Sequence, residues 1–85
     1  MANGSLRVVA RLVAKAGNVD EVRALLEGLV APTRAERGCV SYELLQNRAD
    51  QTDFTFVEEW EDDAALDAHL STAHVRGALS MLPRS

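Results

Sequence analysis

The sequence has few residues of several types, and each scarcity excludes a class of protein. Its single cysteine, Cys39, cannot form an internal disulfide, and no set of Cys and His residues has the spacing of a structural zinc site. Nine basic against thirteen acidic residues give a formal charge of −4, which is the wrong sign for a surface that follows nucleic-acid phosphates. Nucleic acid is therefore not an expected partner, and the lone thiol fits a reducing compartment.

Long apolar runs and nucleotide-binding motifs are also missing. No uninterrupted apolar run approaches the roughly 20 residues that a membrane helix needs, and Met1 to Ser5 lack the basic and apolar regions of a signal peptide. We therefore expect a cytoplasmic protein without membrane contact. The motifs GxGxxG, GxxxxGKS/T, GxSxG and HExxH do not occur, so we expect no cofactor and no metal centre.

What the chain does contain is enough apolar surface for one small core. Hydrophobic residues make up 47% and charged residues 26% of its 85 residues, which predicts a single domain over residues 1–85. A domain of this size buries only about 60% of the surface that its unfolded chain exposes. We therefore expect a partner subunit to contribute to its stability.

The hydrophobic pattern predicts the element order β-α-β-β-α. Alternation predicts strands over residues 6–14, 39–46 and 54–61, and places Cys39 on the strand face opposite Tyr42. Helical spacing predicts a first helix capped by Asn18, with a break over residues 31–37 caused by Pro32. Asp62 or Asp63 would cap a second helix, and a further helical segment would end before Pro83.

This order predicts the α+β class. It is that of a ferredoxin-like split β-α-β fold, an antiparallel sheet with the helices on one face, apparently without the last strand. In the sheet order 4-1-3-2 the first and third strands are neighbours. The face turned away from the helices would carry Arg7 and Arg11 beside Glu59 and Glu61, with valines among them. A second sheet is expected to cover this half-apolar open face.

Two polar residues are expected in the layer between sheet and helices. Strand alternation points Glu58 toward the helices, and His69 lies within the apolar stripe of the second helix. A buried carboxylate needs a partner, so we predict a hydrogen bond between Glu58 and His69. The alternative interpretation is that His69 is a hydrogen-bonded core residue and that Trp60 only packs under the helices.

Such a pair would orient the imidazole as a base that abstracts a proton in a cavity. The predicted walls of this cavity are Phe56, Trp60 and Leu66, and Tyr42 would add a phenol from the neighbouring strand.

His74 follows five residues after His69, which on a continuous helix places the two side chains on different faces. A shared metal ion is therefore not expected, and we interpret His74 as a capping or rim residue.

Three segments together carry a recognisable pattern. They are Arg34-Ala35-Glu36-Arg37-Gly38-Cys39-Val40-Ser41-Tyr42, Phe54-x-Phe56-x-Glu58-x-Trp60 and Ala65-Leu66-x-x-His69-Leu70-x-x-x-His74. The pattern closely resembles the antibiotic biosynthesis monooxygenase (ABM) family, which includes quinol monooxygenases, over about residues 7–82. The resemblance implies a dimeric α/β barrel in which ferredoxin-like subunits form a homodimer through the open sheet face.

The resemblance also implies a function. It is a cofactor-independent monooxygenase that oxidises a small electron-rich aromatic, a quinol or a polyketide-like phenol, with O₂ and without metal, flavin or haem. By position, Glu58, Trp60 and His69 match the family's Glu-x-Trp and helix histidine and would be the catalytic residues. Residues in contact with the substrate would be Tyr42, Phe56, Leu66 and His74.

Two other functions stay open on the same scaffold. One is a noncatalytic small-ligand-binding or interaction module that keeps the dimeric barrel. The other is an isomerase of a small phosphorylated sugar or diketone, which would need Arg34 near the pocket to bind an anion.

Overall fold

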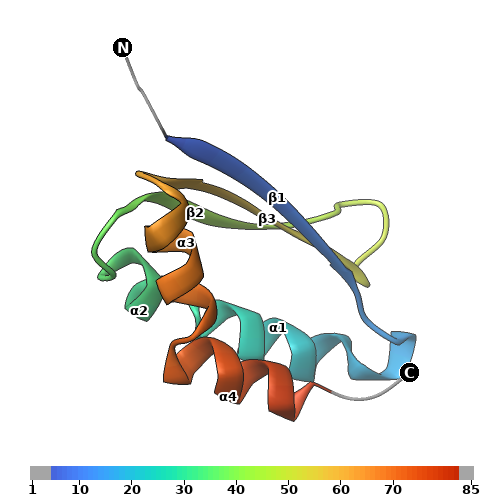
Figure 1. Cartoon of the computed structure of the whole chain (residues 1–85). Helices are drawn as coiled ribbons and strands as arrows, with labels where there is room; N and C mark the ends of the chain where they lie inside the picture. Colours follow the sequence, from blue (N-terminus) through green and yellow to red (C-terminus); the bar gives the residue numbers. More distant parts are fainter. Residues whose placement is uncertain (1–4, 83–85) are drawn as a thin grey trace.

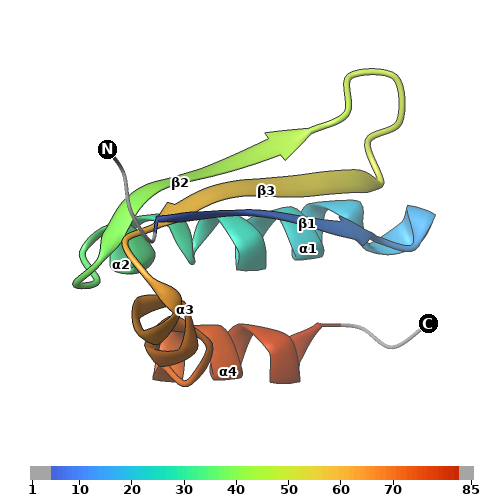
Figure 2. The same ribbon diagram turned by 45° about the horizontal axis from the view of Figure 1, so that its top comes forward.

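The computed structural model describes residues 5–82 as an antiparallel sheet with helices on one face (Figures 1 and 2). The strands are β1 (Leu6–Val13), β2 (Cys39–Gln46) and β3 (Asp53–Trp60), in the order β1-β3-β2. The helices are a 3-10 turn at Ala16–Asn18, α1 (Val19–Glu27), α2 (Val30–Arg34), α3 (Asp63–Leu70) and α4 (Ala73–Met81). The predicted α+β ferredoxin-like fold is confirmed, and the described residues contain three strands. The predictions on Met1 to Gly4 and on Pro83 lie outside these residues.

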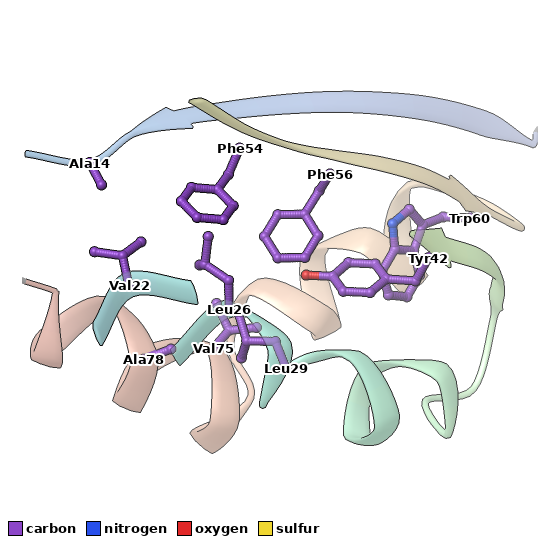
Figure 3. Close-up of a cluster of buried hydrophobic side chains, with 10 residues drawn as sticks. All are labelled: Ala14, Val22, Leu26, Leu29, Tyr42, Phe54, Phe56, Trp60, Val75 and Ala78. Atoms are coloured by element: carbon purple, nitrogen blue, oxygen red, sulfur yellow. The ribbon is translucent and has the colours of Figure 1, made fainter. Parts of the chain in front are cut away.

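The central strand β3 separates the core from the open face of the sheet. Its residues alternate between half-buried and buried from Asp53 to Trp60, as a strand with one covered face must. Phe54, Phe56, Glu58 and Trp60 form the covered row, which confirms the predicted alternation. Figure 3 shows the aromatic side chains of this row projecting from the sheet toward the helices.

Strand β2 contains a bulge that the alternation pattern did not predict. Cys39 pairs with Trp60, and Ser41 pairs with the adjacent residue of β3, Glu59. Val40 between them therefore has no partner on β3 and forms the bulge. Val40 is consequently 53% exposed, whereas Cys39 packs against the core. The prediction that Cys39 and Tyr42 lie on opposite faces is therefore wrong.

The first helical region begins and breaks differently from the prediction. The Asn18 side chain makes no cap hydrogen bond, because the chain enters α1 through a 3-10 turn. The break falls at Gly28 and Leu29, before the predicted residues 31–37. Pro32 is the third residue of α2, where a backbone N–H has no partner within the helix, so the proline is tolerated there.

The core lies between the covered face of the sheet and the helices. It consists of ten buried hydrophobic side chains, among which Trp60 and Phe54 are the largest that are fully buried (Figure 3). Across residues 5–82, no helix has the length and apolar character needed to cross a membrane.

The other face of the sheet carries exposed valines between ion pairs. Val9 is 72% and Val13 is 59% exposed. An Arg7 nitrogen lies 3.7 Å from a Glu59 oxygen, as predicted for this face, but Arg11 pairs with Asp53 at 2.7 Å. The Arg11 hydrogen bond lowers the pKa of Asp53 below its usual value. That a second sheet covers this face stays a prediction.

Gly38 allows the segment after α2 to lie directly against α3. Its φ is +87°, a region that L-residues avoid, and a Cβ added there would lie 2.5 Å from the Ala65 Cβ. Glu36 lies in the same short segment, so this close approach also sets the position of its carboxylate.

Replacing Gly38 by alanine should therefore destabilise the fold. Backbone strain and overpacking against Ala65 together should lower the free energy of unfolding by about 2–4 kcal/mol, measured by urea denaturation. Gly77→Ala is the matched control, because no heavy atom lies within 4 Å of a Cβ at that helical position. It should raise stability by up to about 1 kcal/mol. Equal free energies of unfolding for Gly38→Ala and the parent protein would contradict the expected strain and overpacking at position 38.

Candidate functional site

Two histidines share one carboxylate oxygen. His69 Nδ1 lies 2.8 Å and His74 Nε2 lies 2.6 Å from Oε2 of Glu36. The His69 side chain is 4% exposed, that of Glu36 13% and that of His74 26%, so the cluster runs from the core to the surface. We call these three residues the Glu36 cluster.

A helix break brings the two histidines together. α3 ends at Leu70 and α4 begins at Ala73, so the further helical segment is confirmed. The interpretation that His69 and His74 lie on different faces assumed a continuous helix and is wrong, because the two residues lie on separate helices. Thr72 fixes the connection: its hydroxyl donates to the His69 carbonyl at 2.8 Å and caps α4 by accepting from the Val75 N–H.

The segment between α2 and β2 supplies the carboxylate. The Glu36 N–H donates to the Thr33 carbonyl at 3.0 Å, and the Glu36 carbonyl accepts from the Cys39 N–H at 3.2 Å. These bonds hold the Glu36 backbone from both sides. Because Gly38 lies against α3, the Glu36 side chain reaches both imidazoles.

The predicted hydrogen bond between Glu58 and His69 is not formed. Glu58 is buried, as predicted, but its Oε1 accepts from the Trp60 indole N–H at 2.8 Å. The physical reason is strand geometry, because residues i and i+2 are neighbours on one face of β3 and the indole is the donor beside the carboxylate. His69 Nδ1 contacts Glu36 instead, so the buried Glu58 and the half-buried Glu36 have different partners.

The shared carboxylate also determines which ring nitrogen of His69 can accept a proton. A carboxylate oxygen only accepts hydrogen bonds, so His69 Nδ1 and His74 Nε2 each carry the proton that faces Glu36. A neutral His69 protonated on Nδ1 has an unshared electron pair on Nε2. Its second ring nitrogen is therefore the one that can accept a proton.

A cavity of about 200 Å³ lies beside this ring. It is bounded by β1, by the covered face of the sheet and by α1, α3 and α4. Figure 2 shows these helices on one side of the sheet. Its lining is mostly apolar. His69, Glu58, Tyr42 and Phe56 contribute to the wall, and Leu70 and Leu79, which are 55% and 61% exposed, form part of its rim.

Some of the predicted site residues line the cavity, and the others pack in the core or lie nearer the surface. Tyr42 and Phe56 line the cavity and stack with ring centroids 4.8 Å apart. Trp60 is fully buried against the His69 ring, with centroids 4.6 Å apart, and does not line the cavity. Leu66 packs against the core without lining the cavity, and His74 lies at the surface end of the cluster.

Arg34 is exposed and does not line this cavity. Its Nε donates to the Tyr42 carbonyl at 3.0 Å, and the side chain lies at a separate surface hollow formed with residues 39–43. The isomerase alternative therefore lacks the anion-binding residue that it requires near the central cavity.

Glu36 is the candidate site residue that sequence reasoning missed. It lies 33 residues from His69 along the chain, and no local periodicity links the two. One signal was present for the histidines: Ser71-Thr72 is a capping sequence that starts a new helix and so brings His74 back beside His69. Within residues 5–82, the Glu36 cluster is also the set of three potential metal ligands whose ligand atoms lie within 4.8 Å of one another.

Tyr42 keeps its proton in this environment. Burial of the phenol raises its pKa well above the usual value of 10, and the nearby Glu58 carboxyl acts in the same direction. A neutral phenol at the cavity wall is a hydrogen-bond donor to a bound molecule.

This pKa shift can be measured directly because Tyr42 is the single tyrosine. The tyrosinate absorbance near 295 nm should rise at higher pH in the folded protein than in guanidinium chloride, where the midpoint should return to about 10. Because the folded-state pKa is the higher one, stability should be complete below pH 10 and should fall as the pH rises above it. Equal midpoints in the two states would contradict the burial of the phenol.

Comparisons with known proteins give similar chains of the same fold. The chain is 32% identical over 73 residues to protein sll1783 of Synechocystis, covering 86% of this chain and 50% of the relative. It is 37% identical over 67 residues to "Putative monooxygenase Rv0793" of Mycobacterium tuberculosis, covering 79% and 65%. The chain thus spans between half and two thirds of these curated relatives.

A solved structure agrees with the fold. The crystal structure of PA3566 from Pseudomonas aeruginosa superposes with a TM-score of 0.89 at 38% identity, over 95% of this chain and 81% of that one. The family model described as "Antibiotic biosynthesis monooxygenase" matches residues 5–80, which include the Glu36 cluster and every residue named for the cavity wall. This chain belongs to the antibiotic biosynthesis monooxygenase family.

Proposed function

We propose that this chain is a cofactor-independent monooxygenase of a small electron-rich aromatic, with His69 as the base. The observation that carries the proposal is the hydrogen bond that His69 Nδ1 donates to Glu36, which leaves Nε2 of a cavity-lining imidazole free to take a proton. Membership of the ABM family supports a monooxygenase role. The base differs from the predicted one in its partner, since Glu36 and not Glu58 orients the ring.

The reaction needs no external reductant. His69 Nε2 takes a phenolic proton, and the resulting anion gives an electron to O₂. The two radicals then recombine at a ring carbon within the mostly apolar cavity. For a benzene-type quinol, one oxygen atom ends on the ring, and the other leaves as water with two substrate hydrogens. The product is a hydroxyquinone, and the ring has supplied all four electrons that O₂ takes up.

The cavity size favours a substrate with one aromatic ring. A cavity of about 150 Å³ is known to hold benzene in another protein. The volume of about 200 Å³ here therefore fits a monocyclic quinol, whereas a multi-ring polyketide-like phenol would need the wall to open. Tyr42, neutral and at the wall, would donate a hydrogen bond to a substrate oxygen.

The same proposal includes a homodimer through the open face of the sheet. Val9, Val13 and Leu45 are exposed there by 72%, 59% and 51%, which is a large apolar surface for a chain of 9.3 kDa. A second copy would bury these side chains and keep β1 ordered at the sheet edge.

His69→Asn tests the base most directly. The asparagine amide nitrogen lies where Nδ1 was and can still donate to Glu36, but no atom replaces Nε2. Oxygen uptake with a quinol that the parent protein consumes should fall by about 100-fold or more, since general-base catalysis contributes that much. The thermal midpoint should drop by only a few degrees.

Asp67→Asn is the matched control, because it places the same residue at an exposed position of the same helix. It should keep the parent rate. Unchanged turnover in His69→Asn would reject the assignment of His69 as the base. If the parent protein is stabilised by quinols but mass spectrometry recovers them unmodified after aerobic incubation, the noncatalytic binding module is the correct function.

Val9→Asp tests the dimer interface. A buried carboxylate on each side of the interface is costly, so the variant should sediment at the 9.3 kDa chain mass while the parent sediments at twice that mass. Met81→Asp is the control, a similar change at a residue that is 65% exposed on the helical side. A dimeric Val9→Asp, or a monomeric parent protein, would contradict this interface.

A further inference from the structure

The Glu36 cluster has the composition of a metal site. Two imidazole nitrogens and one carboxylate oxygen lie within 4.8 Å of one another, and all three come from different segments of the chain. This donor set suits Zn²⁺, Co²⁺ and the neighbouring divalent ions, which are commonly bound by two histidines and one acidic residue.

All three ligands must adjust to hold such an ion. Ligand atoms about 2.1 Å from a tetrahedral ion lie roughly 3.4 Å apart. Oε2 of Glu36 lies 2.6 and 2.8 Å from the two nitrogens, so the carboxylate would have to move back by less than 1 Å, and the two nitrogens, which lie within 4.8 Å of one another, would have to approach each other by about 1 Å. Glu36 lies in the connection between α2 and β2 and not within a helix, which allows that movement.

An ion can also reach the cluster and complete its coordination there. The His74 side chain is 26% and that of Glu36 13% exposed, whereas His69 forms the buried end. Because this end of the cluster is partly exposed, water would be the remaining ligand, as in zinc sites with three protein ligands.

We propose that the Glu36 cluster binds a divalent transition-metal ion, and that bound Zn²⁺ blocks the base. The second part rests on the proposed function. Zn²⁺ at Nδ1 of His69 replaces the proton that this nitrogen gives to Glu36. The neutral imidazole then carries its proton on Nε2, with no net change in protons, and His74 shifts its proton to Nδ1 in the same way. Nε2 of His69 then carries a proton and can no longer accept one.

Binding is tested on tag-free, chelator-treated protein. Calorimetric titration with Zn²⁺ should give one site in the parent protein, and the affinity should fall by at least about 10-fold in His74→Ala. With Co²⁺ as the probe, the parent should show visible absorption bands that His74→Ala loses. The control is Glu27→Gln, an exposed glutamate at the end of α1 outside the cluster, which should bind like the parent.

A second variant excludes loss of fold as an explanation. His74→Gln keeps an amide that can donate to Glu36 but is a poor ligand, so it should retain the parent circular dichroism spectrum and lose Zn²⁺ affinity. Equal Zn²⁺ affinity in the parent and both His74 variants would overturn the site.

The inhibitory part has its own readout. Oxygen uptake by the metal-free parent should fall at least about 10-fold at saturating Zn²⁺ and return after chelation. Turnover unaffected by saturating Zn²⁺ would overturn the block of the base. Failure of the metal-free protein to consume any quinol would instead reject the proposed function, and the calorimetric and Co²⁺ results would still decide the binding site.

Discussion

One carboxylate oxygen connects three segments of the chain that local structure does not bring together. Oε2 of Glu36 lies in the connection after α2, and its partners are His69 in the last turn of α3 and His74 in the first turn of α4. A buried imidazole N–H without a partner would cost about 1–3 kcal/mol, so the contact constrains the position of α3 relative to this connection. The orientation of the His69 ring follows from the same contact.

The buried Glu58 and the half-buried Glu36 have separate partners, and this separation shapes the site. Glu58 accepts from Trp60, its neighbour on β3, and the pair forms the packing behind the imidazole. Glu36 reaches His69 from the connection between α2 and β2. The indole N–H therefore gives the buried Glu58 a partner on its own strand, and the Nδ1 contact of His69 is made by Glu36.

Strand β1 contributes to both the cavity and the open face. Ala10 and Leu12 line the cavity, whereas the alternate residues Val9 and Val13 are exposed on the other side of the sheet. β1 is an edge strand that pairs only with β3 among the described residues. A subunit packed on the open face would therefore contact the back of the strand that forms one wall of the cavity. Dimerisation and the shape of the site are coupled through this strand in the function that we propose.

Local patterns were sufficient for most of the fold. The alternation from Phe54 to Trp60 predicted which side chains of β3 are buried, and Asp62 caps α3 through a 2.8 Å bond from the Ala65 N–H, as expected for a cap residue before an apolar stripe. The errors came from features with no fixed period. These are the bulge at Val40, which reverses the face of Cys39, and the helix break before Pro32.

The sequence alone determined that Glu58 and His69 enter the layer between sheet and helices, because strand and helix periodicities act over a few residues. Which donor each buried acid binds was decided only by the tertiary structure. Glu36 lies 33 residues from His69 and 38 from His74, and the contact requires both the close approach at Gly38 and the two-residue break between α3 and α4. Hydrogen bonds form between the groups that packing brings within 3 Å, and periodicity carries no information on that distance.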